Sequence, residues 1–143
     1  MKTNLFIYNC LSAQAKACAD ALEKQWFKFL YNAYKVKVDF DMFSVAVKNL
    51  MDNAIKFSFD KKVVIDVKDN KISFINKGKI PSIEQKLFFE PFAKETSQEN
   101  KDGLGLGLYI TKFIIDKHNL NIYYHYEEDK NIFTIDLKNV ICW

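Results

Sequence analysis

The stretch 41–58 constrains the fold most, because its apolar residues recur at spacings of three and four. That spacing is typical of an amphipathic helix with one buried stripe. Asp39 or Asp41 is suited to cap the amino end of this helix. The buried stripe is expected to contain Phe43, Ala46 or Val47, Leu50, Ala54 and Phe57.

The opposite side of the same helix carries an unusual polar set. Asn49, Asn53 and Lys56 lie at i, i+4 and i+7, so their side chains follow one side of the helix. Two carboxamides and an ammonium group, beside Asp52, suit a metal–polyphosphate ligand. Asparagine is a mediocre helix former, so two within one helix call for an explanation. The alternative is that these side chains simply face solvent.

A second stretch, 102–108, holds three of the four glycines in the chain and leads directly into an expected helix. That helix should run from about Leu106 to His118, with Asn119 suited to a left-handed cap. Glycines before a helix let backbone N–H groups approach an anion, and the helix dipole favours negative charge there. The stretch therefore predicts a phosphate cradle. It is neither a Walker loop nor a dinucleotide fingerprint, because the residues that complete those motifs are missing.

Four motifs in order resemble the ATP-binding catalytic domain of sensor histidine kinases, a branch of the GHKL superfamily that includes gyrase and Hsp90 chaperones. Residues 49–58, Asn-Leu-Met-Asp-Asn-Ala-Ile-Lys-Phe-Ser, look like its N box. Residues 76–80 occupy the place of its first glycine box, 87–92 are similar to its F box, and 103–108 look like its last glycine box. The resemblance covers residues 4–138, nearly the whole chain.

The pattern and the resemblance together imply one α/β (α+β) domain over 1–143, a two-layer sandwich of the Bergerat type. Its mixed, mainly antiparallel sheet would carry about three helices on one face, and an ATP lid would span about 78–102. A further helix is expected at 13–24, and a hairpin turn at 68–70. Strands are expected at 4–8 on the sheet edge and at 27–31, 36–38, 62–66, 71–75, 121–126 and 131–137.

The resemblance implies a role in catalysis for three polar residues of the N box. Asn53 would hold the Mg²⁺ ion that bridges the ATP phosphates, since a carboxamide oxygen suits a hard cation. Lys56 would meet the phosphates as a point charge. Asn49 stands where hydrolysing relatives carry a glutamate that activates water. Because asparagine cannot act as a general base, we expect the domain alone to be a poor ATPase.

The resemblance also assigns ATP contacts across the other motifs and the lid. Lys94 and Lys101 would reach the phosphates when the lid closes, or are merely solvated. The aromatic cluster at 88–92 either packs into the core or anchors the lid and docks on a partner. The implied ATP contacts are Asn49, Asn53, Lys56, Asn76, Gly78, Ile80, Phe92, Lys94, Lys101, Gly103, Leu104, Gly105, Leu106, Gly107 and Leu108.

The first glycine box departs from the family pattern at two positions. Asn76 stands for an aspartate that accepts a hydrogen bond from the adenine amino group, and Lys79 stands for the second glycine. Asparagine keeps an acceptor oxygen, but a neutral acceptor should bind more weakly than a carboxylate. Lys79 removes backbone freedom that the lid uses. The adenine affinity and the lid motion are the properties these departures would change.

Neither histidine has the helical acidic and basic context of a phosphoacceptor, so His118 and His125 are expected to be structural. In the family, the attacking histidine belongs to a separate two-helix dimerisation domain. The chain therefore looks like the carboxyl-terminal catalytic fragment of a longer kinase.

The overall composition narrows the class of protein further. The formal charge is only +3, with lysines scattered among acids, which argues against a nucleic-acid surface. No apolar run has the roughly 20 residues needed to span a bilayer, and no signal peptide is evident. We expect a cytoplasmic domain whose parent protein is anchored in the inner membrane. Cys10, Cys18 and Cys142 follow no metal or redox pattern and are interpreted as reduced structural thiols.

The resemblance implies the catalytic domain of a two-component sensor histidine kinase. It would bind Mg-ATP and transfer the γ-phosphoryl group to a histidine of the dimerisation helices, for relay to a response regulator. One alternative is a serine kinase of the anti-sigma type, against which Asn49 and the F box argue. Another is a degenerate module that acts only in protein contacts, which the altered first glycine box would favour.

Overall fold

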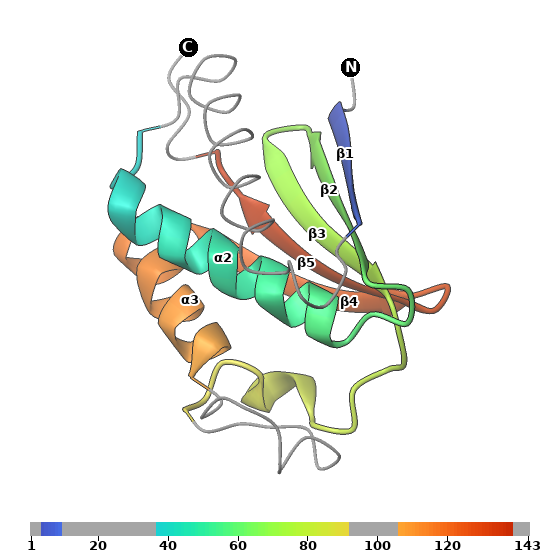
Figure 1. The fold of residues 1–143 in the computed structure, drawn as a ribbon. Helices are drawn as coiled ribbons and strands as arrows, with labels where there is room; N and C mark the ends of the chain where they lie inside the picture. The colour runs from blue at the N-terminus through green and yellow to red at the C-terminus, as the bar shows by residue number, and fades with distance from the viewer. Residues whose placement is uncertain (1–3, 10–36, 92–105, 139–143) are drawn as a thin grey trace.

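A computed structural model describes residues 4–9, 37–91 and 106–138, which form a five-stranded sheet with two α-helices on one face (Figure 1). The strand order is β1-β2-β3-β5-β4, and each neighbouring pair is antiparallel. The strands are β1 (Asn4–Asn9), β2 (Lys62–Lys68), β3 (Lys71–Lys77), β4 (Asn121–Glu127) and β5 (Lys130–Asp136). The helices are α2 (Phe40–Lys56), α3 (Gly107–Lys117) and a short 3-10 turn, η2 (Gln85–Leu87).

Two tight hairpins set the register of the sheet. Asp69 and Asn70 connect β2 to β3 with φ values of 54° and 63°. Glu128 and Asp129 connect β4 to β5 with φ values of 50° and 60°. Two consecutive left-handed residues are typical of the hairpin turn that matches strand twist. The hairpin expected at 68–70 is therefore confirmed.

The helices cover one face of the sheet and leave the other open. α2 packs on β2 and β3, α3 packs beside α2 and against β4, and the apolar core lies between the layers (Figure 1). Along β2 and β3 the buried residues alternate with exposed or half-buried ones, as expected for a sheet with one solvated face. The side chains buried most completely are Phe43, Phe74, Leu50, Met51, Ile65, Ile72, Ile115, Ile135, Leu137 and Val47.

The predicted helix at 41–58 is confirmed as α2. Asp39 is the residue that caps it, because its side chain accepts a hydrogen bond from the backbone N–H of Met42. Phe57 is the carboxyl-terminal cap and only half-buried, so the predicted stripe is one residue too long there. Met51 and Ile55 are buried as well, which makes the apolar face wider than predicted.

The other expected elements have mixed outcomes. The prediction of a strand at 36–38 is wrong for residues 37 and 38, which are irregular and lead directly into the cap of α2. No parallel pairing occurs among the five described strands, so the expected mixed character is not found there. The helix expected at 13–24, the strand at 27–31 and the lid beyond residue 91 lie outside the described residues. Strand β1 is at the sheet edge, as predicted.

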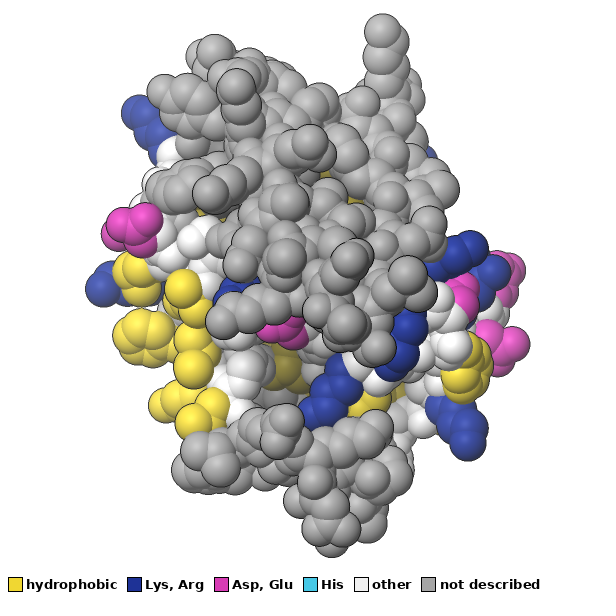
Figure 2. Space-filling view, viewed as in Figure 1, with side chains coloured by type: hydrophobic (Ala, Val, Ile, Leu, Met, Phe, Trp, Pro, Cys, Tyr) yellow, Lys and Arg dark blue, Asp and Glu magenta, His cyan; other side chains and the backbone are white. Residues whose placement is uncertain are grey.

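Apolar side chains are exposed on the outer side of the helix pair. Figure 2 shows them gathered on the flank of the molecule where α3 lies. Tyr109, Ile110 and Phe113 of α3 and Val45 of α2 are each more than a third exposed. Among the described residues, no helix combines the length and apolarity required to cross a bilayer.

Candidate functional site

The polar residues of the N box lie on the flank of α2, between its buried stripe and solvent. Asn49, Asn53 and Lys56 are all half-buried, whereas Asp52 is exposed. The ammonium group of Lys56 lies 5.6 Å from the ring centre of Phe57, a distance at which a cation interacts with an aromatic face. These three side chains are therefore partly covered and partly in contact with solvent.

A hydrogen bond joins the N box to the end of the glycine stretch. The Nδ2 group of Asn49 donates to the carbonyl oxygen of Gly107 at 3.2 Å, across a sequence separation of 58 residues. The hydroxyl of Thr111, which is buried, donates to the same oxygen at 2.8 Å. The first turn of α3 is thus fixed against the middle of α2.

The amino end of α3 has features that suit an anion. Its cap residue, Leu106, provides no side-chain hydrogen bond, and the first turn contains no acidic residue. The first backbone N–H groups of any α-helix lack partners within the helix, and they carry the positive end of its dipole. Together with Asn49 and Asn53 on the facing helix, this end could bind a phosphate group.

Gly78 lies at a tight junction between the end of α2 and the β4–β5 turn. Its N–H donates to the carbonyl oxygen of Asp129 at 2.9 Å, and its own carbonyl accepts from the hydroxyl of Tyr126 at 3.0 Å. Desolvation, together with the nearby carboxylate of Asp129, raises the pKa of Tyr126, so its hydroxyl remains a donor. The backbone of Gly78 is therefore engaged within the protein.

Asn76 and Asn131 are cross-strand partners that are equally buried but differently bonded. Each is 4% exposed. Asn131 donates from Nδ2 to the carbonyl oxygen of Lys79 and accepts from the hydroxyl of Tyr124. The Nδ2 group of Asn76 is buried with no hydrogen-bond partner among the described residues. A buried N–H group without a partner is costly, so Asn76 is a candidate to meet a ligand.

The remaining residues predicted to contact ATP either lie in differing environments or fall outside the described residues. Ile80 is 62% exposed, and Leu108 is half-buried against the core. Phe88 packs edge-on against Tyr124 with ring centres 4.7 Å apart, so core packing is confirmed for this part of the F box. Phe92, Lys94, Lys101, Gly103, Leu104 and Gly105 lie outside the described residues.

Comparison with known families agrees with this geometry. Residues 39–140 match the family described as histidine kinase-, DNA gyrase B- and HSP90-like ATPases. That range covers α2, α3 and four of the five strands. The chain belongs to this ATPase family.

Curated relatives of this ATPase-family chain are bacterial sensor kinases. It is 38% identical over 102 residues to the sensor histidine kinase ArsS of Helicobacter pylori, covering 71% of this chain and 24% of ArsS. It is 36% identical over 84 residues to the histidine protein kinase SaeS of Staphylococcus aureus, covering 52% of this chain and 24% of SaeS. The chain thus spans about a quarter of the length of these relatives.

Solved structures support the ATPase-family fold. The mycobacterial sensor histidine kinase MprB superposes with a TM-score of 0.61 at 23% identity, over 81% of this chain and 92% of that one. The catalytic domain of histidine kinase ThkA superposes with a TM-score of 0.56 at 22% identity, over 92% of this chain and 93% of that one. At this level of identity the likeness establishes the fold alone.

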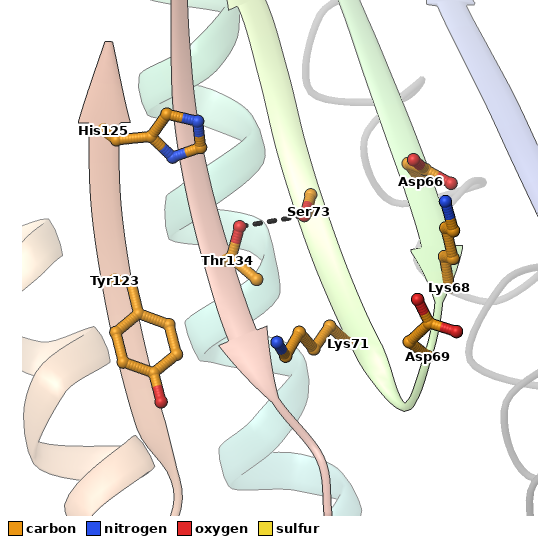
Figure 3. A pocket seen from close by; sticks show the side chains of 8 residues that line it. All are labelled: Asp66, Lys68, Asp69, Lys71, Ser73, Tyr123, His125 and Thr134. Carbon is orange, nitrogen blue, oxygen red and sulfur yellow. Dashed lines mark hydrogen bonds between the residues drawn. The ribbon is translucent and has the colours of Figure 1, made fainter.

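A hollow of about 360 Å³ lies on the open face of the sheet, away from α2 and α3 (Figure 3). It contains a hydrogen bond of 2.8 Å between the hydroxyls of Ser73 and Thr134. Its charges are mixed, and it has neither the asparagine pair nor the helix end of the site above. The hollow is lined by Asp66, Lys68, Asp69, Lys71, Ser73, Tyr123, His125 and Thr134.

Sequence reasoning did not find Asn131, Tyr124 or Tyr126 as supports of the site. The bonds from Asn131 to Lys79 and from Tyr126 to Gly78 depend on the pairing of β3 with β5, which are far apart in the chain. The bond from Tyr124 to Asn131 lies within the β4–β5 hairpin, and its role appears only once that hairpin is placed beside β3. The only available signal was the position of Asn131 in a strand whose alternate residues are apolar.

Proposed function

We propose that this chain is the ATP-binding catalytic domain of a two-component sensor histidine kinase. Mg-ATP would bind between α2 and the amino end of α3. The observation that carries this proposal is the hydrogen bond between Asn49 and Gly107, because it brings the N box beside the end of the glycine stretch. The family membership and the sensor-kinase relatives support it.

The residues at the site fit a magnesium–nucleotide ligand. Half-buried Asn53 offers a carboxamide oxygen on the same flank as Asn49, and Mg²⁺ accepts such ligands together with phosphate oxygens. Within 4–9, 37–91 and 106–138 no group of three His, Cys, Asp or Glu residues could hold a metal ion. The ion would therefore take most of its ligands from phosphate and water, and it would neutralise the charge of the phosphates. The carboxamide of Asn76, whose Nδ2 group has no partner among the described residues, would hydrogen-bond the base, with its oxygen accepting from the adenine amino group.

The described residues contribute binding and positioning rather than a nucleophile. Asn49 is already a donor to Gly107, and a carboxamide cannot accept a proton from water. Both ring nitrogens of His118 contact backbone atoms, and His125 lies on the open face of the sheet. The γ-phosphoryl group would pass to a histidine of a separate dimerisation domain. A nitrogen–phosphorus bond would form there as the bond to the ADP oxygen breaks.

The proposed partners are the dimerisation helices of the parent kinase and, through them, a response regulator. The exposed apolar side chains of α3, Tyr109, Ile110 and Phe113, would suit a contact with such helices.

Calorimetric titration with Mg-ADP tests the nucleotide site. We expect saturable binding in the micromolar to millimolar range, about 4 to 8 kcal/mol. Asn53→Ala should abolish binding, whereas Asn121→Ala, at an exposed position of β4, should leave it unchanged. A folded chain that gives no heat at millimolar nucleotide would contradict the proposal and favour a module that acts only in protein contacts.

A further inference from the structure

Two polar contacts bracket the packed pair of helices α2 and α3. At one end, Asn49 Nδ2 donates to the carbonyl oxygen of Gly107. At the other end, the backbone N–H of Asp39 donates to Nε2 of His118 at 2.9 Å. Asp39 and Asn49 are separated along α2 by about 15 Å at 1.5 Å per residue. Between them the helices meet through apolar side chains, including Phe43 and Val47 of α2.

The contacts of His118 determine its tautomer. Nδ1 lies 2.8 Å from the carbonyl oxygen of Ile114, which can only accept, so Nδ1 carries the ring proton. Nε2 receives the N–H of Asp39, so it has a free lone pair. These contacts assign the ring proton of His118 to Nδ1. Its ring also packs edge-on against Phe43, with the centres 6.1 Å apart.

Asp39 is a well-placed anchor for this contact. Its carboxylate accepts from the N–H of Met42 at 3.1 Å, and its carbonyl accepts from the N–H of Phe43 at 2.9 Å. These bonds build the first turn of α2, and the remaining backbone N–H of Asp39 is used by His118. The carboxyl end of α3 is thereby tied to the first turn of the helix that carries the N box.

We infer that His118 is a positioning residue for the nucleotide site, because it fixes the register of α3 along α2. Interlocking apolar side chains resist both separation and sliding of two helices, and directional hydrogen bonds at both ends of the contact select one register. Sliding would move Gly107 away from Asn49 and change the spacing between the N box and the phosphate-binding helix end. Sites that bind a polyphosphate tolerate such displacement poorly. This inference rests on the proposed function.

Two substitutions separate the contacts of the ring. His118→Asn places an amide near Nδ1, so the bond to Ile114 can persist while the acceptor for Asp39 is lost. His118→Gln places an amide oxygen near Nε2 and should restore that acceptor. His125→Asn, on the open face of the sheet, is the control for loss of a histidine. Each variant is studied in the full chain, at a temperature where circular dichroism shows it fully folded.

Two measurements test the inference. Nitrogen-15 NMR of the nucleotide-free protein should show protonated Nδ1 and unprotonated Nε2 in His118. His118→Asn should shift the side-chain amide signals of Asn49, at the opposite end of the helix pair, and weaken Mg-ADP binding by roughly tenfold. His118→Gln should recover most of the affinity, and His125→Asn should change neither signal nor affinity.

Three results would overturn the inference. One is a proton on Nε2 of His118, and another is an affinity equal to that of the unmutated chain in folded His118→Asn. The third is an unchanged Asn49 amide signal in that variant. If the unmutated chain itself binds no nucleotide, the proposed function fails, while the Asn49 signal in the free protein still decides whether His118 sets the register.

Discussion

Gly78 lies directly against Phe57, so that a Cβ atom built on Gly78 would be 2.4 Å from the Phe57 carbonyl oxygen. Phe57 is the carboxyl-terminal cap of α2, and Gly78 immediately follows β3. The absence of a side chain therefore lets the N-box helix end close to the sheet. The neighbouring bond from Phe59 N–H to the carbonyl oxygen of Lys77, at 2.8 Å, draws the two segments together.

The first prediction compares two glycine substitutions. Gly78→Ala should lower the free energy of unfolding by about 1 to 3 kcal/mol, because backbone must move to make room. Gly107→Ala should not destabilise the protein, since the nearest atoms among the described residues, in Asn49, lie 3.9 Å from the new Cβ. Urea unfolding monitored by circular dichroism measures both. Equal stabilities for the two variants would contradict the close approach seen at Gly78.

The second prediction concerns the aromatic cluster beyond η2. Phe88 is 6% exposed and contacts Tyr124 and Phe133, whereas Phe89 is only half-buried. Phe88→Ala should lower the free energy of unfolding by about 3 kcal/mol through the cavity it leaves. Phe89→Ala should cost clearly less. Thermal unfolding of both variants checks this order, and the reverse order would mean that Phe88 does not anchor this segment to the core.

Local sequence signals predicted much of the fold. The spacing of apolar residues located α2, and its start was predicted to within two residues, with Asp39 or Asp41 as the cap; the structure uses Asp39. The Lys68-Asp69-Asn70 signal located the first hairpin, and Asn119 has the left-handed conformation expected at the end of α3, with a φ of 57°. These features depend on residues within a few positions of each other, where backbone sterics and capping decide the outcome.

Features that depend on distant pairs could not be predicted in the same way. The pairing of Asn76 with Asn131 requires β5 to insert beside β3, and no turn connects these strands. The bond between Asp39 and His118 likewise joins residues 79 positions apart. The register between elements that are far apart in the chain is set by how all the elements pack together. Local patterns in a single sequence do not contain that information.

The third prediction is a pH dependence at the end of α2. Partial burial alone would raise the pKa of Asp60, but hydrogen bonds from the Ser58 hydroxyl and the Lys62 N–H lower it overall. A carboxylate with a lowered pKa stabilises the folded state above its ordinary pKa, and that stability is lost as the pH falls through the lowered value. Asp60→Asn should therefore reduce stability at neutral pH and make no difference at the acid end. Urea midpoints measured from pH 2 to pH 7 check this, with Asp69→Asn as the control. Parallel profiles for the unmutated chain and Asp60→Asn would contradict it.

The fourth prediction uses the two buried asparagines as a matched pair. Asn131→Leu should lower the free energy of unfolding by about 1 to 3 kcal/mol, because the Lys79 carbonyl and the Tyr124 hydroxyl lose their partner. Asn76→Leu has the same shape change at the cross-strand position, but it removes a buried N–H group that has no partner within the part of the chain that the structure describes. It should therefore raise stability, by about 1 kcal/mol.

The same pair separates stability from nucleotide binding. If the Asn76 amide binds the nucleotide, Asn76→Leu should gain stability and lose affinity for Mg-ADP. Binding sites often show such an opposition between stability and function. Asn131→Leu should mainly lower the stability of the fold. Its affinity for Mg-ADP should fall only to the extent that the loss of stability distorts the site. Calorimetric titration and urea unfolding of both variants give the four values required. An Asn76→Leu variant that is destabilised would mean that this amide has a partner within the folded protein. A stabilised variant that still binds Mg-ADP normally would mean that the ligand does not reach Asn76.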